Sequence, residues 1–294
     1  MSAFRCGTIA LAGRPNTGKS SLLNKLLGEK LAIVSRKAQT TRHLVTGILT
    51  TADCQYLMVD LPGYQTRHVN VLNRVLNRRA IEGARDCDLV AFVVEALRFG
   101  RADRAVLARI PAQARIIGVV NKIDLVRNRL ELLPFIERLS RERNFAAVVP
   151  VSARTGENLE ELLRVLRDGL PEAPAAYPAD QLTDRNERFL ATEILREKLF
   201  RVLGEELPYR CDVALESFRE EGRLRRIEVT IWVERESQKP IVVGAGGATL
   251  KKISSAARRD MEARFGGPVY LGVWVKVKRD WTADARALKQ LGYG

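Results

Sequence analysis

The sequence predicts two domains: an α/β domain with a mostly parallel sheet covered by helices on both faces, followed by a smaller α+β domain. As far as residue 170, apolar segments of strand length alternate with segments of helical period, which is typical of parallel sheets. A proline-rich segment without apolar period then follows. Beyond it the order is helix, two strands, helix and strand. We therefore expect a first domain over 1–170, a linker over 171–182 and a second domain over 183–294.

The first domain contains a glycine-rich segment that fits the pattern G-x-x-x-x-G-K-[ST] at every fixed position. An apolar strand over 8–12 precedes it, and a leucine-rich helix over 21–28 follows it. The backbone N–H groups of such a turn, with the positive end of the helix dipole, suit a phosphate. An ordinary strand–turn–helix corner explains the glycines but not the Lys-Ser pair after them. The predicted phosphate-binding residues are Gly13, Arg14, Pro15, Asn16, Thr17, Gly18, Lys19, Ser20 and Ser21.

Magnesium ligands are expected on both sides of a hairpin. Ser20 would bind Mg²⁺ directly. Residues 35–42 are polar and predict a mobile loop, from which Thr40 or Thr41 could close over the metal. Strands over 44–49 and 55–59 lead to a D-x-x-G segment, where the carboxylate can hold Mg²⁺ through a water and the glycine N–H can approach the γ-phosphate. That segment consists of Asp60, Leu61, Pro62 and Gly63.

Guanine recognition is predicted at the ends of two later strands. A helix over 71–85, a strand over 89–94, a helix over 101–109 and a strand over 115–120 continue the alternation. Asn121, Lys122 and Asp124 follow as N-K-x-D, where ligands of parallel sheets bind. Asp124 could accept two hydrogen bonds from guanine, whereas adenine would leave it unpaired at a cost of about 1–3 kcal/mol. A strand over 148–151 runs into Ser152 and Ala153, whose N–H groups could reach guanine O6.

The ordered series of motifs predicts a domain that binds GTP and GDP. The last helix of this domain is expected to begin at Asn158, with that side chain as its cap.

Charge favours a polyanionic partner. The chain has 49 Lys and Arg against 35 Asp and Glu, a net charge of +14, which suits nucleic acid or an anionic membrane surface. In the second half the excess is concentrated in residues 239–289, which hold eleven basic and four acidic side chains. No apolar run reaches the roughly 20 residues of a membrane span. Four scattered cysteines and two histidines argue against a zinc centre and fit the cytoplasm.

A nucleic-acid site is predicted in the second domain. We expect a helix over 186–203, strands over 211–219 and 225–234, a helix over 248–265 and a strand over 269–278. A G-x-x-G loop precedes the second helix and can press its backbone against the phosphates of single-stranded RNA, although this pattern also occurs at many ordinary helix starts. The predicted RNA-binding residues are Gly244, Ala245, Gly246, Gly247, Lys251, Lys252 and Arg258.

Taken together, these features resemble the Era family of bacterial GTPases along essentially the whole chain. The phosphate loop, residues 38–42, N-K-x-D and the segments 268–271 and 274–278 carry the resemblance. It implies a P-loop GTPase domain followed by a type II KH domain, and hydrolysis of GTP with Mg²⁺ held by Ser20, Thr41 and Asp60. It further implies binding near the 3′ end of 16S rRNA during assembly of the 30S subunit, by a cytoplasmic monomer with some peripheral association at the inner membrane. The implied catalytic residues are Lys19, Thr41 and Gly63.

Several positions bear on mechanism. Tyr64 stands where many signalling GTPases carry a water-orienting glutamine, so hydrolysis is expected to be slow without help. Asn16 matches an asparagine that related GTPases use to bind K⁺, which we carry as a hypothesis. Leu61 replaces the family's usual threonine, and Ala245-Gly246 lacks its usual basic residue. Two alternatives remain open: a GTPase acting at an anionic membrane surface, and an RNA chaperone with a vestigial GTPase.

Overall fold

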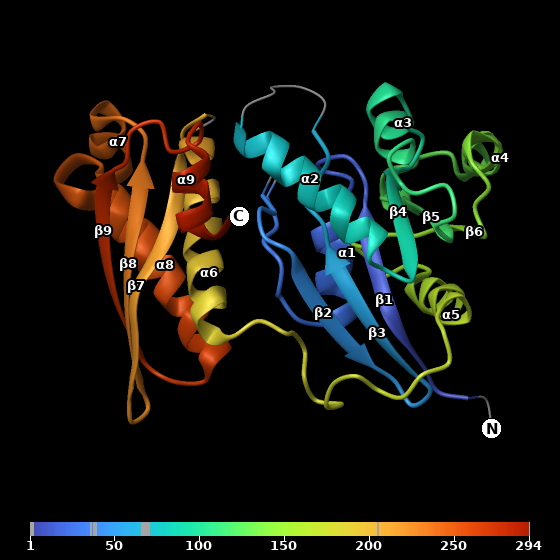
Figure 1. The fold of residues 1–294 in the computed structure, drawn as a ribbon, viewed down its shortest axis with the longest axis horizontal. Helices are drawn as coiled ribbons and strands as arrows, with labels where there is room; N and C mark the ends of the chain where they lie inside the picture. Colours follow the sequence, from blue (N-terminus) through green and yellow to red (C-terminus); the bar gives the residue numbers. More distant parts are fainter. Residues whose placement is uncertain (1–2, 36, 38–39, 66–70, 205, 294) are drawn as a thin grey trace. The chain divides into compact units, whose positions relative to one another are not determined.

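The computed structural model describes residues 3–35, 37, 40–65, 71–204 and 206–293. Arg36, Ala38 and Gln39 of the predicted mobile loop lie outside this described part. The chain forms two compact units: the first holds most residues up to Asp184, and the second holds those from Arg185 together with Val71 and Leu72 at the start of α2 (Val71–Arg85) (Figure 1). Each unit has its own sheet.

The first unit is built on a six-stranded sheet of order β2-β3-β1-β4-β5-β6. Its strands are β1 (Arg5–Ala12), β2 (Val45–Thr50), β3 (Cys54–Asp60), β4 (Leu89–Glu95), β5 (Ile116–Asn121) and β6 (Ala147–Pro150). Strand β2 is antiparallel to β3, and the other neighbouring pairs are parallel. The predicted mostly parallel sheet is confirmed. Its parallel strands bring their carboxyl ends to one edge, where ligands of such sheets bind.

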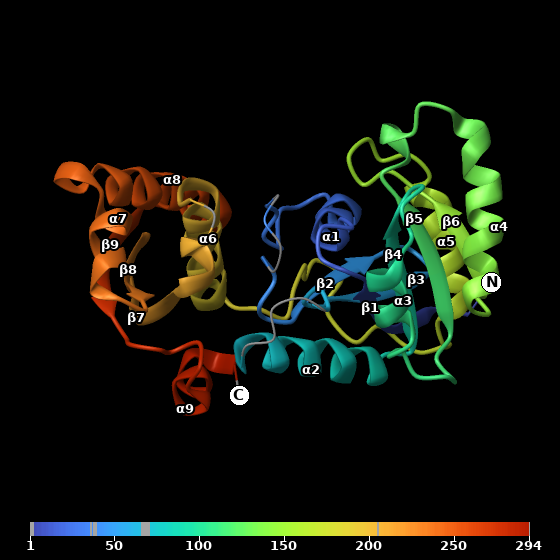
Figure 2. The same ribbon diagram turned by 90° about the horizontal axis from the view of Figure 1, so that it is seen from above.

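Helices cover both faces of this sheet (Figures 1 and 2). They are α1 (Lys19–Leu27), α2 (Val71–Arg85), α3 (Arg101–Leu107), α4 (Leu132–Glu142) and α5 (Leu159–Gly169). Helices α2, α3 and α4 share one apolar core with β1, β4 and β5, and α1 and α5 contact strands on the other face. Helix α4 was not predicted, although Leu132, Phe135 and Leu139 are buried at helical spacing.

The expected cap of α5 is wrong. Asn158 precedes the helix, but its backbone is left-handed, with φ of 59°. Its side-chain Nδ2 donates to the carbonyl of Pro150 at 3.0 Å and makes no cap bond to the helix. The left-handed turn directs the amide back to the end of β6, so the residue joins strand to helix instead of closing the helix.

The second unit is a three-stranded sheet with helices. Its strands are β7 (Cys211–Glu221), β8 (Leu224–Val233) and β9 (Val269–Val277), and its helices are α6 (Glu187–Val202), α7 (Lys239–Val243), α8 (Ala248–Phe265) and α9 (Ala285–Leu288). Strands β7 and β8 are antiparallel, while β8 and β9 are parallel. Helices α6 and α8 pack against each other and against the sheet (Figure 1). The predicted order of elements is confirmed, and the short helices α7 and α9 are added.

The segment after α5 is bonded to the first unit. Gln55 is fully buried; its Oε1 accepts from the N–H groups of Ala176 and Tyr177 at 2.8 and 2.9 Å, and its Nε2 donates to the Tyr177 carbonyl at 2.8 Å. Further along, the Thr183 hydroxyl donates to the carbonyl of Thr46 at 2.7 Å. The proline-rich segment thus lies along the edge of the sheet, and the domain limits at 170 and 183 stay a prediction.

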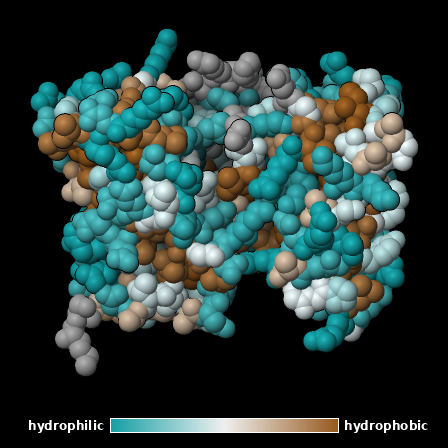
Figure 3. Space-filling model, turned by 180° about the vertical axis from the view of Figure 1, so that it is seen from behind, coloured by the Kyte–Doolittle hydropathy of each residue, from teal (hydrophilic) through white to brown (hydrophobic). Residues whose placement is uncertain are grey.

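Within the described ranges, no helix combines the length and the apolar character that crossing a bilayer requires. The face seen in Figure 3 is mainly hydrophilic, and its hydrophobic residues lie in separate groups.

We predict that Gln55→Ala lowers the free energy of unfolding of the first unit by about 1–3 kcal/mol, because the part-buried N–H groups of Ala176 and Tyr177 and the Tyr177 carbonyl lose their partner. Urea unfolding followed by far-UV circular dichroism measures this free energy. Gln55→Glu retains one acceptor for the two N–H groups but sets its second oxygen against the Tyr177 carbonyl, so it should also lose stability. Limited proteolysis near Tyr177 should accelerate in the alanine variant, and equal cleavage rates would contradict the anchoring role of Gln55.

Candidate functional site

The phosphate loop connects β1 to α1, as the sequence predicts, and its glycines are required by close approaches. A Cβ on Gly13 would lie 2.4 Å from the Val93 carbonyl oxygen, and a Cβ on Gly18 would lie 2.3 Å from Nδ2 of Asn121. Gly18 also has a left-handed φ of 99°. The loop is therefore pressed against β4 and the residue that ends β5, a position that only glycine allows.

Lys19 is the first residue of α1 and is nearly fully buried. Its Nζ donates to the carbonyls of Gly13 and Arg14 at 3.2 and 3.1 Å, so the side chain curls back over the phosphate loop. Burial is the main cause that lowers its pKa from 10.5 to about 8, although Asp60 opposes the shift. A phosphate here would add an anionic partner that offsets the hydration the ammonium group loses on burial.

Three oxygen atoms from separate elements converge next to Lys19. The hydroxyls of Ser20 and Thr41 both donate to Oδ2 of Asp60, at 2.6 and 3.0 Å, and lie 3.0 Å from each other. These hard oxygen ligands fit Mg²⁺, which commonly combines one or two protein groups with substrate phosphates. The hydroxyl of Thr40 points elsewhere and donates to the carbonyl of Lys37 at 2.9 Å. The geometry therefore favours Thr41 over Thr40.

Asn121 links the phosphate loop to the predicted base-binding segments. Its Nδ2 donates to the Thr17 carbonyl at 2.9 Å, and its Oδ1 accepts from the N–H groups of Lys122 and Ala153 at 2.8 and 3.0 Å. The side chain is buried. Because the Ala153 N–H is engaged here, its expected bond to guanine O6 has to share or replace this contact.

Asp124 and Ser152 are brought together at the same edge of the sheet. Oδ1 of Asp124 accepts from the Ser152 hydroxyl at 2.5 Å, and Oδ2 accepts from Nε of Arg154 at 2.7 Å. Burial alone would raise the pKa of Asp124, but these two hydrogen bonds hold it below its ordinary value. The carboxylate is thus ionised and oriented. The contact of Arg154 was missed from the sequence, although it directly follows Ser152-Ala153.

A group of charged side chains supports the site from α3 and β4. Arg14 donates to Oδ1 of Asp103 at 3.1 Å and lies 3.6 Å from Glu95, which also accepts from Lys122 at 2.7 Å. Burial would raise the pKa of Glu95, but its bond with Lys122 and the nearby arginines lower it. Neither acid was predicted, because their distance in sequence from the phosphate loop leaves no local pattern.

A polar pocket lies over these residues. It is lined by Pro15, Asn16, Gly18, Lys19, Ser20, Ser21, Ile33, Val34, Ser35, Thr40, Thr41 and Gly63. A Cβ on Gly63 would lie 2.9 Å from the backbone N of Pro15, so the D-x-x-G segment rests on the phosphate loop. Leu61 lies in the apolar core and, together with Pro62, lines a second, apolar pocket. The structure thus separates these two residues of the tetrapeptide from the polar pocket.

The G-x-x-G loop stands at the start of α8. Gly244, Gly246 and Gly247 all have positive φ, of 76°, 55° and 81°. A Cβ on Gly244 would lie 2.3 Å from the hydroxyl of Thr249, whereas one on Gly246 or Gly247 would meet nothing within 4 Å. The tip of the loop is therefore open, as close contact with an RNA backbone requires.

Basic and apolar groups lie next to this loop. Lys251 and Lys252 are exposed in the first turn of α8. Arg258 lies about two turns further along α8. It forms an ion pair with Glu262 at 2.9 Å, so part of its charge is compensated within the helix. Ile241, just before the loop, is 58% exposed and was missed as an individual residue. It offers an apolar contact for a base.

Nucleotide affinity should depend on the protonation of Lys19. Its pKa near 8 in the free protein will rise when phosphates bind, so at higher pH binding must take up a proton. We expect GDP affinity to be nearly constant from pH 6.5 to 7.5 and to fall above pH 8, approaching tenfold per pH unit. Calorimetry at pH 6.5–9 measures both affinity and proton uptake. Lys19→Arg, charged throughout, should bind with no such fall, and parallel profiles for both proteins would contradict the assignment.

Comparison with protein families gives two matches along the chain. A model described as 50S ribosome-binding GTPase matches residues 8–122, and a model described as KH domain matches residues 206–282. Among solved structures, Aquifex aeolicus Era bound to GDP and AlF4⁻ is 34% identical with a TM-score of 0.95, and covers 99% of this chain and 100% of that one. A complex of Era with MgGDPNP and nucleotides 1506–1542 of 16S ribosomal RNA has the same identity and TM-score, and covers 99% of both chains.

Curated relatives extend over the full length as well. GTPase Era of Nitrosomonas eutropha is 51% identical, covering 99% of each chain, and GTPase Era of Chromobacterium violaceum is 52% identical, covering 98% of each. Identity at this level, spread over both the phosphate-loop unit and the KH unit, shows that the chain belongs to the Era family of GTPases.

Proposed function

We propose that this GTPase is a switch whose nucleotide state governs binding of 16S rRNA, near its 3′ end, through the KH domain during assembly of the 30S subunit. The observation that carries the proposal is the convergence of Ser20, Thr41 and Asp60 within 3.0 Å. Thr41 belongs to the loop before β2, Ser20 to α1 and Asp60 to β3, so a ligand that these groups share can change the position of that loop.

In hydrolysis, the side chains position the phosphates and neutralise their charge. Lys19 binds the β- and γ-phosphates, and the Gly63 N–H donates to the γ-phosphate. Ser20, Thr41 and Asp60 would hold Mg²⁺, which when bound would supply positive charge against the phosphate oxygens. Asp124 selects guanine. The intact set of these groups argues against a vestigial GTPase.

A second cation is a finer part of the proposal. Asn16 has a left-handed φ of 64° and lines the polar pocket next to Lys19, so its side chain lies where K⁺ could stabilise charge between the phosphates. We predict faster single-turnover hydrolysis in KCl than in NaCl at equal ionic strength, with the difference lost in Asn16→Ala. Equal rates for the wild-type protein in both salts would exclude this role.

For location and assembly state, we propose a cytoplasmic monomer that reaches the inner membrane only peripherally. The net charge of +14 would favour an anionic surface, so the membrane reading is tested against RNA directly. Binding to vesicles with anionic lipid but not to single-stranded RNA would support the alternative of a membrane GTPase.

The decisive measurement is binding of a short RNA with the sequence of the 16S rRNA 3′ end, in the presence of a GTP analogue or GDP at fixed salt. We expect tighter binding with the analogue. Lys251→Gln with Lys252→Gln should weaken binding and reduce the slope of log affinity against log salt by about 1.4, since each phosphate contact on a single strand contributes about 0.7. Arg138→Gln with Arg141→Gln, both exposed on α4, is the matched control that removes the same two charges. Equal affinity in both nucleotide states would contradict the switch.

A further inference from the structure

The segment that follows the D-x-x-G motif is fastened to α2 through its backbone. Oδ1 of Asn77 accepts from the N–H of Gln65 at 2.8 Å, and Nδ2 of Asn77 donates to the carbonyl of Gln65 at 2.9 Å. One side chain in the middle of a helix thus satisfies both backbone groups of a single loop residue. Such a paired contact fixes the position of the peptide units on either side, because neither can turn without breaking a bond.

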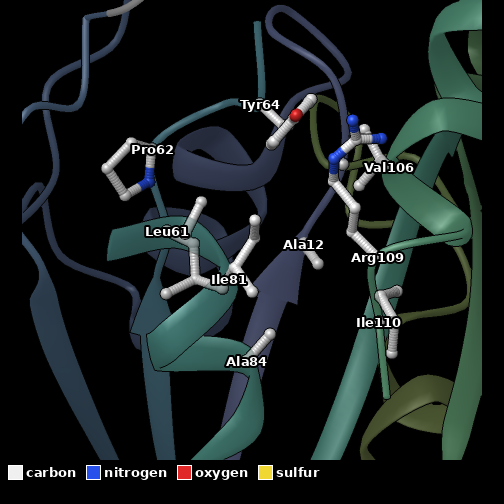
Figure 4. Close-up of a pocket in the computed structure, with 11 residues that line it drawn as sticks. Ala12, Leu61, Pro62, Tyr64, Ile81, Ala84, Val106, Arg109 and Ile110 are labelled. Atoms are coloured by element: carbon white, nitrogen blue, oxygen red, sulfur yellow. The ribbon is translucent and has the colours of Figure 1, made fainter. Parts of the chain in front are cut away.

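The preceding residue, Tyr64, is held from the other side. The guanidinium carbon of Arg109 lies 4.5 Å from the centre of the Tyr64 ring, a cation–π distance. Arg109 follows α3, and its Nη1 donates to the Ala105 carbonyl of that helix at 2.7 Å. Figure 4 shows the guanidinium directed toward the tyrosine. The cation is therefore itself positioned by a helix end.

Tyr64 and Arg109 both line an apolar pocket, against which the tyrosine ring lies. Ala12 and Gly13 at the start of the phosphate loop, Leu61 and Pro62, α2 side chains and the end of α3 line it (Figure 4). Tyr64 packs against the same core. The pocket thus brings together the phosphate loop, the D-x-x-G segment and both helices.

Gly63 lies immediately before these two anchored residues and against the phosphate loop. A Cβ here would come within 2.9 Å of the Cα and N of Pro15. With the loop as one wall and the anchored Tyr64 and Gln65 on the other side, the Gly63 peptide has little freedom. Its N–H is the group expected to meet the γ-phosphate.

We propose that Asn77 and Arg109 are positioning residues for GTP hydrolysis, which fix Tyr64 and Gln65 and thereby hold the Gly63 N–H in the place where the γ-phosphate arrives. This rests on the proposed role of Gly63. Because Tyr64 stands where a glutamine would orient the water, the preformed backbone donor of Gly63 contributes a larger share of the rate of hydrolysis. GDP lacks the γ-phosphate, so the two residues act on the rate and leave GDP affinity unchanged.

The test is single-turnover hydrolysis and GDP binding of Asn77→Ala, Arg109→Ala and the double variant. We expect each single change to lower the rate constant roughly tenfold, because a donor that must be ordered during the reaction loses its advantage, with GDP affinity within twofold of wild type. Arg109→Lys keeps the cation and should recover part of the rate. The double variant should be little worse than either single variant, since both residues hold one segment. Arg101→Ala, exposed at the start of α3, is the control.

The outcomes are separable from those of the switch proposal. If Asn77→Ala and Arg109→Ala both hydrolyse GTP at the wild-type rate or faster, the positioning role is overturned. A parallel loss of rate and GDP affinity would also overturn it, since that indicates general damage to the site. Hydrogen exchange at the Gln65 amide supplies a readout apart from activity. Exchange should accelerate in Asn77→Ala, and unchanged protection would show that the two Asn77 hydrogen bonds do not hold this peptide.

Discussion

The nucleotide site depends on the close approach of the Asn121 side chain to Gly18. The amide binds the Thr17 carbonyl on one side and the Ala153 N–H on the other, and it reaches the phosphate loop only because Gly18 has no Cβ. Through this buried group, three segments far apart in sequence share one set of hydrogen bonds. Loss of the Asn121 amide would leave buried groups without a hydrogen-bonding partner, which is costly. A change at Asn121 is therefore expected to weaken both phosphate binding and base binding.

Around this fixed frame, the groups that respond to the nucleotide come from loops. Ser20 is anchored in α1, while Thr41 reaches Asp60 from the loop before β2. The Thr41 hydroxyl joins this loop to the metal position, so loss of a shared ligand can release that contact without unfolding the sheet, as in the order–disorder switches of other nucleotide-binding proteins. The D-x-x-G segment differs, because Asn77 and Arg109 hold the residues after it. The D-x-x-G side of the γ-phosphate position is thus held by contacts that begin on two helices.

In the second unit, the G-x-x-G loop and the first residues of α8 form the expected RNA-binding surface. Positive φ at three of four residues opens the backbone of the G-x-x-G segment at the start of α8, and the two lysines behind it are exposed. Affinity for a polyanion would come from these charges and from the helix end, whereas Ile241 offers apolar contact to bases. The family's usual basic loop residue is absent here, which places more of the electrostatic work on α8.

The mostly parallel sheet and the order of the elements follow from the sequence, and the phosphate, metal and guanine positions are predicted from it, because all of these depend on local patterns: apolar runs, glycine spacing and polar residues at strand ends. Helix α4 shows an equally local signal that was not used. The three-dimensional structure supports the Thr41 that the family resemblance already favoured, since its hydroxyl donates to Asp60. Only the three-dimensional structure shows the turning of Asn158 toward Pro150 and the supporting contacts of Glu95, Asp103, Asn77 and Arg109. Each joins segments whose separation in sequence leaves no pattern, and only packing brings them within hydrogen-bond distance.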